Sequence, residues 1–540
     1  MNLQFLLAEK LNSKVLLKEE KIGKYYFIAI AIAAIILFGF NLGQLPLRDW
    51  DESIVAQVAV SIWKSPDNLE TWLYPQIQAQ PYLNKPPLIH WAIALTYLCF
   101  GVSEWSSRFM PAMLSAASVP LLYLIAREIF PRRSIALFST LVYLTFLPIV
   151  RHGRLAMLDG AVISFFLLLI WFVLRAYKSP KNSLGIGLAM AAICLTKGIM
   201  MGILLGGIAI VFLFWDDRKI FRSKYFWIGI ILGLIPVFAW YGCQYYKYGN
   251  YFININFVGQ SFSRIWQPVD NKSGDLWYYL LEILKYSWPW AIFCPGAIAI
   301  ARESRQQTRG KLIIVWSGIY LLAISLMSTK LPWYVLPIYP ALALLIGAKL
   351  DNIWHENRQK NYPIYWSGML SLLAILIWGA GIYLSFGWFN QPSEPDLKII
   401  FIAVGLTMTI AAILTALKSR YFILVLGVGL YVSFILFFNS KTWIWELAEA
   451  YPVKPVAEIV ASETPAGKII YTSYPYFRPS LNFYSDRQVI PATIAELKSY
   501  WQEKERPYFL IETAITKNLN LKNVRILKKA IGWEIITKNK

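Results

Sequence analysis

Long apolar runs separated by short polar segments fill the chain from residue 25 to residue 439. About 20 apolar residues in a helix are enough to cross the hydrocarbon core of a bilayer. The pattern predicts thirteen such spans, near residues 25–45, 108–126, 134–150, 160–177, 183–199, 200–216, 224–243, 277–300, 312–328, 333–349, 364–387, 398–416 and 421–439. We therefore expect an α-helical polytopic membrane domain over residues 25–439.

One further apolar stretch, 88–101 (LIHWAIALTYLCFG), is short and follows NKPP, so it could be a span or a helix lying at the membrane interface. The charges of the loops favour the second alternative. With 88–101 left out of the count, every short basic loop shares a side with the lysine-rich segment 1–24, as the positive-inside rule requires. The basic residues of these loops are Arg127, Arg132, Arg133, Lys178, Lys181, Arg218, Lys219, Arg222, Lys224, Arg302, Arg305, Arg309, Lys311, Arg358, Lys360, Lys418 and Arg420.

This topology places residues 1–24 in the cytoplasm and makes residues 46–107 a first external loop with interfacial helices. The pattern then changes after about residue 440, where a polar tail follows the last span. GKIIYTSY and RPYFLIET are typical of β-strands, and segments 452–463 and 493–504 have helical periodicity. We expect a small α/β domain over residues 440–540, on the external side because the number of spans is odd.

Composition agrees with a membrane protein and excludes a soluble one. Of the 540 residues, 57% are hydrophobic and 15% are charged. The net charge of +21 is explained by topology and contact with anionic lipids, since basic and aromatic residues do not alternate as they do in proteins that bind nucleic acid. The four cysteines lack the spacing of metal ligands, and we interpret them as packing residues.

The predicted topology also gathers unusual polar residues on the external face. They lie in the 46–87 loop, in RHGRLAMLDG, in TKG, in the 244–276 loop and in STKLPWYVLP. Carboxylates among lysines, arginines and tyrosines suit a reaction between a lipid phosphate and a hydroxyl group. A carboxylate can take the proton of the hydroxyl, while the cations stabilise the charge on the departing phosphate.

Each of these residues also has a purely structural interpretation. Asp51 could cap a helix that starts near Ser53, and Asp159 could be a cap or an ion-pair partner of Arg154. A lone histidine beside a span, such as His152, is typically a hydrogen-bonded structural residue. Lysines near the interface can extend their charged ends toward water, an interpretation open for Lys85, Lys197 and Lys330.

Taken together, the motifs are more informative than any one of these residues alone. The order WDESIVAQ, YLNKPPLIHW, RHGRLAMLDG, LTKG, SWPW and STKLPWYVLP resembles the lipid A aminoarabinose transferases and their bacterial relatives. These enzymes share the GT-C glycosyltransferase architecture with protein O-mannosyltransferases. The resemblance covers roughly residues 25–350, and it implies a GT-C fold with about 13 transmembrane helices.

The resemblance also implies roles for particular residues. The catalytic carboxylate of the first external loop matches Asp51, with Glu52 beside it, and a second acid at the start of a later span matches Asp159. The family residues that hold the phosphate of the lipid carrier match Tyr82, Lys85, Lys197, Arg264 and Tyr334.

Two positions depart from the family pattern. The aminoarabinose transferases hold a zinc ion through a glutamate before the KP lysine and a histidine in the second large external loop, where this chain has Asn84 and Gln260. Amides are poor zinc ligands, so we predict that the zinc site is lost; no cofactor is predicted, and a different divalent cation is left open. The two changes also weaken the case for aminoarabinose as the transferred sugar.

Together with the external cluster, the resemblance implies an inverting glycosyltransferase of the bacterial inner membrane that acts on the periplasmic face. The donor would be a sugar linked to polyprenyl phosphate, such as undecaprenyl phosphate, and the acceptor lipid A, another lipid or a glycan. A protein O-glycosyltransferase or O-mannosyltransferase of the same fold is the first alternative. A lipid-phosphate flippase or transporter is the second, although transporters usually place ionisable residues at mid-membrane and contain repeated halves.

Overall fold

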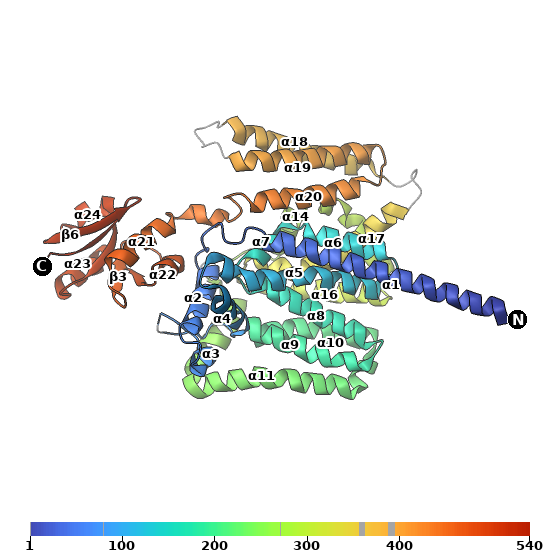
Figure 1. Cartoon of the computed structure of the whole chain (residues 1–540), viewed down its shortest axis with the longest axis horizontal. Helices are drawn as coiled ribbons and strands as arrows, with labels where there is room; N and C mark the ends of the chain where they lie inside the picture. Colours follow the sequence, from blue (N-terminus) through green and yellow to red (C-terminus); the bar gives the residue numbers. More distant parts are fainter. Residues whose placement is uncertain (1, 79, 270–271, 356–361, 387–394, 540) are drawn as a thin grey trace.

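The computed structural model describes residues 2–539 except 79, 270–271, 356–361 and 387–394, so Arg358 and Lys360 of one predicted basic loop lie outside the described residues. Long helices form one bundle, and a small α/β domain projects from one end of it, opposite the end at which the N-terminus lies (Figure 1). The helices of the bundle are α1 (Asn2–Gly39), α5 (Glu104–Ile129), α6 (Arg133–Leu144), α7 (Leu147–Arg154), α8 (Asp159–Ala176), α9 (Leu184–Lys197), α10 (Ile199–Asp216), α11 (Lys224–Tyr248), α14 (Tyr278–Tyr286), α15 (Cys294–Glu303), α16 (Thr308–Leu326), α17 (Tyr339–His355), α18 (Ile364–Phe386), α19 (Pro395–Ala416) and α20 (Phe422–Phe438).

Within the described ranges, nine helices are long and apolar enough to cross a membrane, and a tenth span results if α6 and α7, which meet at 62°, are counted as one. The multi-pass helical fold is therefore confirmed, while the number thirteen stays a prediction. Two of the predicted spans correspond to shorter helices, α9 with 14 residues and α20 with 17.

The apolar run 277–300 does not form the single continuous helix that its hydropathy predicts. The chain leaves α14 at Tyr286, makes a short 3₁₀ helix over Trp290–Phe293 and then enters α15. Pro289 and Pro295 lie where these pieces begin. Proline has no N–H to donate within a helix, so a helix is interrupted where prolines occur in its interior.

The first loop after α1 contains α2 (Asp51–Trp63), α3 (Leu69–Leu73), the strands β1 (Gln76–Ile77) and β2 (Gln80–Pro81), and α4 (Leu88–Phe100). The 13 residues of α4 extend only about 20 Å, less than the roughly 30 Å of a hydrocarbon core. One apolar cluster joins α2 to α4 through residues such as Val55, Ile62, Ile93 and Tyr97. The structure thus has a short helix at 88–101, and its interfacial placement stays a prediction.

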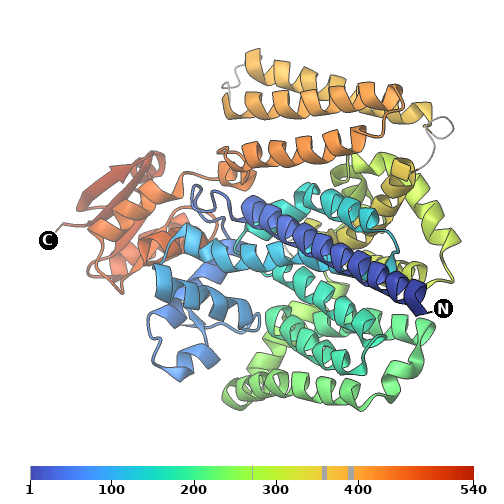
Figure 2. The same ribbon diagram turned by 45° about the vertical axis from the view of Figure 1, so that its right-hand side comes forward.

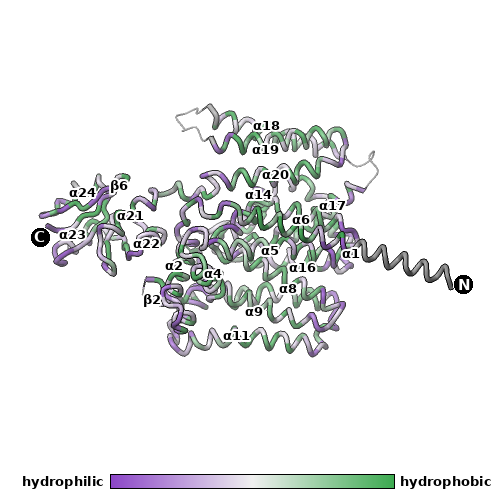
Figure 3. The backbone as a smooth tube through the Cα atoms, viewed as in Figure 1, coloured by the Kyte–Doolittle hydropathy of each residue, from purple (hydrophilic) through white to green (hydrophobic). Residues whose placement is uncertain are grey.

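Hydrophilic segments gather at the two ends of the bundle (Figure 3). At the end that carries the N-terminus, ion pairs join loops that are far apart in the sequence. They link Lys178 to Glu128 at 2.5 Å, Arg132 to Asp351 at 3.1 Å and Lys311 to Asp216 at 3.2 Å. Loops that the charge pattern assigns to one side of the membrane therefore do meet at one end of the molecule.

The C-terminal domain is a five-stranded sheet with helices on both faces (Figure 2). The strands are ordered β4 (Gln488–Pro491), β3 (Ile469–Thr472), β5 (Tyr508–Glu512), β7 (Trp533–Lys538) and β6 (Val524–Ala530), and β3 is parallel to both of its neighbours. Along β5, Leu510 packs in one apolar cluster with α21 (Val453–Glu463), whereas Phe509 and Ile511 pack with α23 (Ile494–Glu503). The predicted strands and helices of this domain are confirmed.

Candidate functional site

A cavity of about 660 Å³ lies where the bundle, the first loop and the C-terminal domain meet. The sequence-predicted residues that line it are Asp51, Tyr82, Asn84, Lys85, Asp159, Lys197, Gln260, Arg264 and Tyr334. They come from five separate segments, so the fold brings together what the sequence spreads from residue 51 to residue 334. Glu52 is the one predicted site residue that lies outside the lining.

A tight turn sets the direction of the Asp51 carboxylate. Trp50 has φ 64° and ψ −74°, and the N–H of Asp51 donates to the carbonyl of Asp49 at 2.8 Å. These values define a γ-turn with a positive φ, which is rare and strained for a residue with a bulky side chain. No side chain caps α2, and the Asp51 carboxylate accepts from the Arg48 guanidinium instead. The cap interpretation of Asp51 is therefore not supported.

The C-terminal domain holds this turn in place. Arg478 donates through Nε to Asp49 Oδ2 at 3.0 Å, and the backbone N–H of Ser480 donates to Asp49 Oδ1 at 2.9 Å. The ring of Trp50 lies edge-to-face against Phe477, with centroids 5.9 Å apart. A strained turn persists only where its surroundings fix it, and here a second domain supplies the contacts.

Charges around Asp51 act in opposing directions. Burial raises the pKa of the Asp51 carboxyl, and the Asp159 carboxylate nearby raises it too, while Arg48 and Lys272 lower it, leaving a net increase. The Arg48 guanidinium also donates to Glu446 at 3.0 Å, and Glu446 pairs with Arg151 as well. A carboxylate with a raised pKa is a stronger base than an ordinary aspartate.

Asp159 is the first residue of α8, and it forms an ion pair with Lys197 at the last turn of α9. Both side chains are nearly buried. Arg154 is not its partner, because the Arg154 guanidinium donates to the carbonyls of Leu37, Phe38 and Phe40. No side-chain hydrogen bond caps α8, so Asp159 faces the cavity as half of an ion pair.

The remaining cations and phenols gather on the cavity wall formed by the bundle. Arg264 donates to the hydroxyl of Tyr334 at 3.1 Å and to Oε1 of Gln260 at 3.0 Å. The Lys197 ammonium lies 5.4 Å from the centre of the Tyr334 ring. Tyr82 is buried, and burial together with the nearby Asp51 carboxylate raises the pKa of its phenol.

Lys85 differs from the other cations of the cavity. It has no hydrogen-bond or ion-pair partner among the residues that the structure describes. Burial, and then the charges of Arg264 and Lys197, lower the pKa of the Lys85 ammonium to about 7, although Asp159 opposes this. An ammonium that burial and like charges destabilise is a strong candidate to bind an anion.

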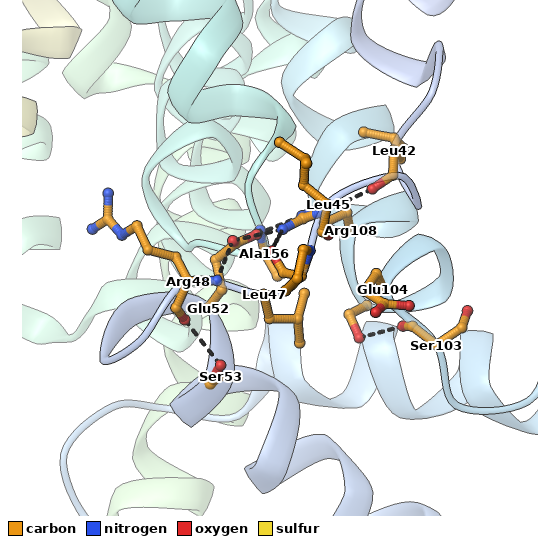
Figure 4. A network of polar contacts seen from close by, with 12 residues as sticks. Leu42, Leu45, Leu47, Arg48, Glu52, Ser53, Ser103, Glu104, Arg108 and Ala156 are labelled. Carbon is orange, nitrogen blue, oxygen red and sulfur yellow. Dashed lines mark hydrogen bonds and ion pairs between the residues drawn. The ribbon is translucent and has the colours of Figure 1, made fainter. Parts of the chain in front are cut away.

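Glu52 forms a buried ion pair behind the cavity wall (Figure 4). Its carboxylate accepts from Arg108 at 2.7 and 2.9 Å, from the N–H of Arg48 at 2.9 Å and from the N–H of Ala156 at 2.8 Å. Burial alone would raise the pKa of Glu52, but the Arg108 guanidinium and these hydrogen bonds lower it. Arg108 also donates to the carbonyls of Leu42, Leu45 and Pro46. Glu52 thus joins the start of α2 to α5 and to the segment between α7 and α8.

Other residues of the predicted external cluster have structural contacts. His152 is buried beside Trp333, and its Nδ1 lies 3.1 Å from the carbonyl of Pro148. Lys330 donates to the carbonyls of Ile324 and Ser325 at the end of α16. Neither lines the cavity.

The residues present do not fit a zinc ion. Asn84 and Gln260 both line the cavity at the positions that the family resemblance gives to zinc ligands, but their side chains are amides. The Gln260 oxygen already accepts from Arg264. Within the described part of the chain, no group of three or more His, Cys, Asp or Glu side chains could hold a metal ion.

Sequence reasoning missed Arg48, Arg108, Glu446 and Arg478, all of which help to position the site. Arg108 lies inside an apolar span, and an ionisable residue there is a reason to expect a buried partner. The other three carried no comparable signal, because each has a partner far away in the sequence. Arg48 pairs with a residue 398 positions later.

The chain is similar in sequence to several known proteins. A family model described as dolichyl-phosphate-mannose-protein mannosyltransferase matches residues 84–241. Undecaprenyl phosphate-alpha-4-amino-4-deoxy-L-arabinose arabinosyl transferases of Pseudomonas are 27% identical to the chain: the alignment covers 69% of this chain and 69% of the P. aeruginosa protein, and 57% of this chain and 56% of one from P. fluorescens. An uncharacterized protein of Aquifex aeolicus is 25% identical over 86% of this chain and 88% of its own length.

Solved structures with the same fold cover nearly the whole chain. ArnT from Cupriavidus metallidurans bound to undecaprenyl phosphate has a TM-score of 0.77 and 18% identity, over 95% of this chain and 98% of that protein. The archaeal oligosaccharyltransferase AglB from Archaeoglobus fulgidus has a TM-score of 0.53 and 11% identity, over 92% and 70%. At these identities the likeness shows the fold.

Proposed function

We propose that the chain is a member of the GT-C group of integral-membrane glycosyltransferases, which includes the aminoarabinose transferases, and that it moves a sugar from a polyprenyl-phosphate donor to an acceptor hydroxyl. One observation carries the proposal. A single cavity contains two carboxylates, Asp51 and Asp159, and a lysine, Lys85, that lacks an anionic partner among the described residues.

In this mechanism Asp51 accepts the proton of the acceptor hydroxyl as its oxygen bonds to the anomeric carbon of the donor sugar. The bond between that carbon and the phosphate oxygen breaks, and the polyprenyl phosphate leaves with the electron pair. Attack from the face opposite the phosphate inverts the anomeric carbon. Asp159 orients the acceptor or supports Asp51, and its ion pair holds Lys197 at the cavity.

Lys85, Lys197 and Arg264 stabilise the negative charge of the departing phosphate, and the phenols of Tyr82 and Tyr334 contribute hydrogen bonds. The Arg264–Tyr334 hydrogen bond and the contact of Lys197 with the Tyr334 ring support a joint role for these groups. Glu52 is a positioning residue in this proposal, because its two carboxylate oxygens already accept hydrogen bonds from four N–H groups.

We also propose how the chain is oriented in the membrane and in which membrane it lies. Residues 1–24 lie in the cytoplasm, residues 25–439 form the membrane domain, and the cavity and residues 440–540 face the periplasm of a bacterial inner membrane. The observation in favour is that basic loops meet at the end of the bundle opposite the C-terminal domain.

A protein O-glycosyltransferase is the second candidate, favoured by the description of the family model that matches residues 84–241. It differs in its acceptor, a serine or threonine of a polypeptide, and not in the donor chemistry. A flippase has less support, because the relatives are glycosyltransferases and the acids lie at one end of the bundle.

Sugar transfer by membranes that contain a radiolabelled polyprenyl-phosphate donor pool tests the function. We expect Lys85→Ala to lower kcat/KM for the donor by about 10–100-fold, since a hydrogen bond to a charged group contributes about 1.5–3 kcal/mol. An external protease added to intact spheroplasts should remove the activity. A flippase would instead transfer no label in wild type or variant, and a protease without effect would contradict the orientation.

The pH dependence gives an independent check on Lys85. Only the protonated lysine carries the charge that binds phosphate, so kcat/KM for the donor should fall by up to tenfold per pH unit above about pH 7, the pKa of Lys85 in the free protein. Lys85→Arg keeps its charge at all accessible pH values and should move this alkaline limb upward. An alkaline limb that stays near pH 7 in Lys85→Arg would show that another group titrates there.

A further inference from the structure

One wall of the cavity belongs to the C-terminal domain and carries three aromatic rings, and we call it the aromatic wall. Tyr474, Tyr476 and Phe477 follow strand β3 and line the cavity together with Trp50 of the first loop. Tyr476 and Trp50 keep 68% and 54% of their surface accessible, so both rings are open to a ligand. Trp50 is the residue directly before Asp51, so this wall starts next to the proposed base.

The aromatic wall is held rigidly against the first loop. Directly after Arg478, α22 (Pro479–Ser485) docks on α2, where Gln57 donates to the carbonyl of Pro479 at 2.6 Å. The N–H of Leu47 donates to the Tyr484 hydroxyl at 2.8 Å, and Lys64 pairs with Asp486 at 2.6 Å. These contacts, together with those of Arg478 and Ser480 to Asp49, fix the position of the aromatic wall relative to Asp51.

The aromatic wall differs in charge from the part of the lining that the membrane domain forms. The charged residues that the C-terminal side adds to the lining are Arg478, paired with Asp49, and Glu446, paired with Arg48 and Arg151. Cavity-lining cations without an ion pair among the described residues, namely Lys85, Arg264 and Lys272, all come from the membrane domain. An anionic group is thus attracted to the bundle wall, and the aromatic wall offers it no free cation.

The geometry of the wall also bears on a peptide ligand. An extended peptide commonly binds by adding a strand to an exposed sheet edge. The edges of this sheet are β4 and β6, and neither contributes to the cavity lining. The loop that does line the cavity follows β3, which has strands on both sides.

We propose that this aromatic wall is the acceptor subsite and that it binds a neutral sugar unit of the acceptor. The electron-rich face of an aromatic ring attracts the weakly positive C–H groups on one face of a sugar ring. A sugar packed against Trp50 and Tyr476 would present a hydroxyl to the adjacent Asp51 carboxylate. The inference rests on the proposed function and adds to it the chemical class of the acceptor.

The test measures which membrane fraction receives label from the radiolabelled donor pool, and how acceptor dependence changes in Tyr476→Ala. Neutral glycans and glycolipids are separated from phosphorylated glycolipids and from proteins. We expect label in the neutral fraction, and we expect Tyr476→Ala to raise the KM for that fraction about tenfold or more while kcat at saturation changes little. Ile494→Ala is the matched control, since Ile494 is an exposed residue of the same domain outside the cavity.

Binding of undecaprenyl phosphate to the purified protein separates the two hypotheses. Tyr476→Ala should bind it as wild type does, because the cations without an ion pair among the described lining residues all come from the membrane domain. Label in the protein fraction, label only in phosphorylated glycolipids, or an unchanged acceptor KM in Tyr476→Ala would each overturn the neutral-sugar subsite while leaving the transferase intact. Transfer to no fraction, with undecaprenyl phosphate binding unaffected by Lys85→Ala, would instead contradict the proposed function itself.

Discussion

Replacing Asp51 with asparagine is expected to lower the rate of sugar transfer by about 10²–10⁴-fold, the range that general acid–base catalysis typically contributes. The amide keeps the size of the side chain and its hydrogen bond from Arg48, but it cannot accept the proton of the acceptor hydroxyl. Because the loss concerns the chemical step, kcat should fall at saturating donor and acceptor.

Folding should change little in this variant. Asp51 is partly exposed to the cavity, and Arg48 keeps its ion pair with Glu446 when the Asp51 charge is removed. The matched control is Asp67→Asn, which removes an exposed carboxylate of the same loop outside the cavity and should leave the rate unchanged. A rate in Asp51→Asn within a few fold of wild type, with intact folding, would remove Asp51 from the chemistry.

Asp51→Asn should also alter the acid side of the pH profile. The pKa of the Asp51 carboxyl is raised above its ordinary value, and only the deprotonated form accepts a proton. Activity of the wild type therefore rises with pH through this raised pKa. The residual activity of the variant should lose that limb.

Replacing Glu52 with alanine is expected to destabilise the protein by about 3–5 kcal/mol, the usual effect of removing one partner of a buried ion pair. Glu52 and Arg108 are both fully buried, so the variant leaves a guanidinium without its counter-charge. The N–H groups of Arg48 and Ala156 also lose their acceptor. A thermal unfolding series in detergent measures the effect.

The exposed pair Lys247–Glu70 provides the control. The Glu70 side chain is 62% exposed, and an ion pair in water contributes at most about 1 kcal/mol, so Glu70→Ala should unfold close to wild type. If Glu52→Ala kept its stability and lost transfer activity, Glu52 would have to act in the chemistry, as the family resemblance suggests for an acid of this loop.

The ion pair between Glu52 and Arg108 could not be predicted from the sequence. In sequence, Glu52 and Asp51 are adjacent acids and nothing distinguishes their roles. One helical position apart, they point in different directions: Asp51 lines the cavity, and Glu52 faces Arg108 from another helix. Asp51 and Glu52 therefore have different roles, because other elements pack against more than one side of α2.

Much of the architecture was determined by the sequence alone, because the bilayer imposes strict rules on length, hydropathy and charge. Apolar length predicted the long helices α5, α8, α10, α11, α16, α17, α18 and α19. Period-2 and period-3.6 patterns predicted the elements of the C-terminal domain, and basic loops predicted which ends meet. The prolines of 277–300 show the limit of hydropathy, which counts apolar residues but does not register a missing N–H.

Only the tertiary structure decided how the site is completed. The pairings of Asp49 with Arg478, of Arg48 with Glu446 and of Glu52 with Arg108 join segments that lie tens to hundreds of residues apart. No local pattern encodes such contacts, since a side chain acquires its partner only when two elements dock. The sequence therefore determined which residues could do the chemistry, and the packing of the C-terminal domain on the first loop decided how they are aimed.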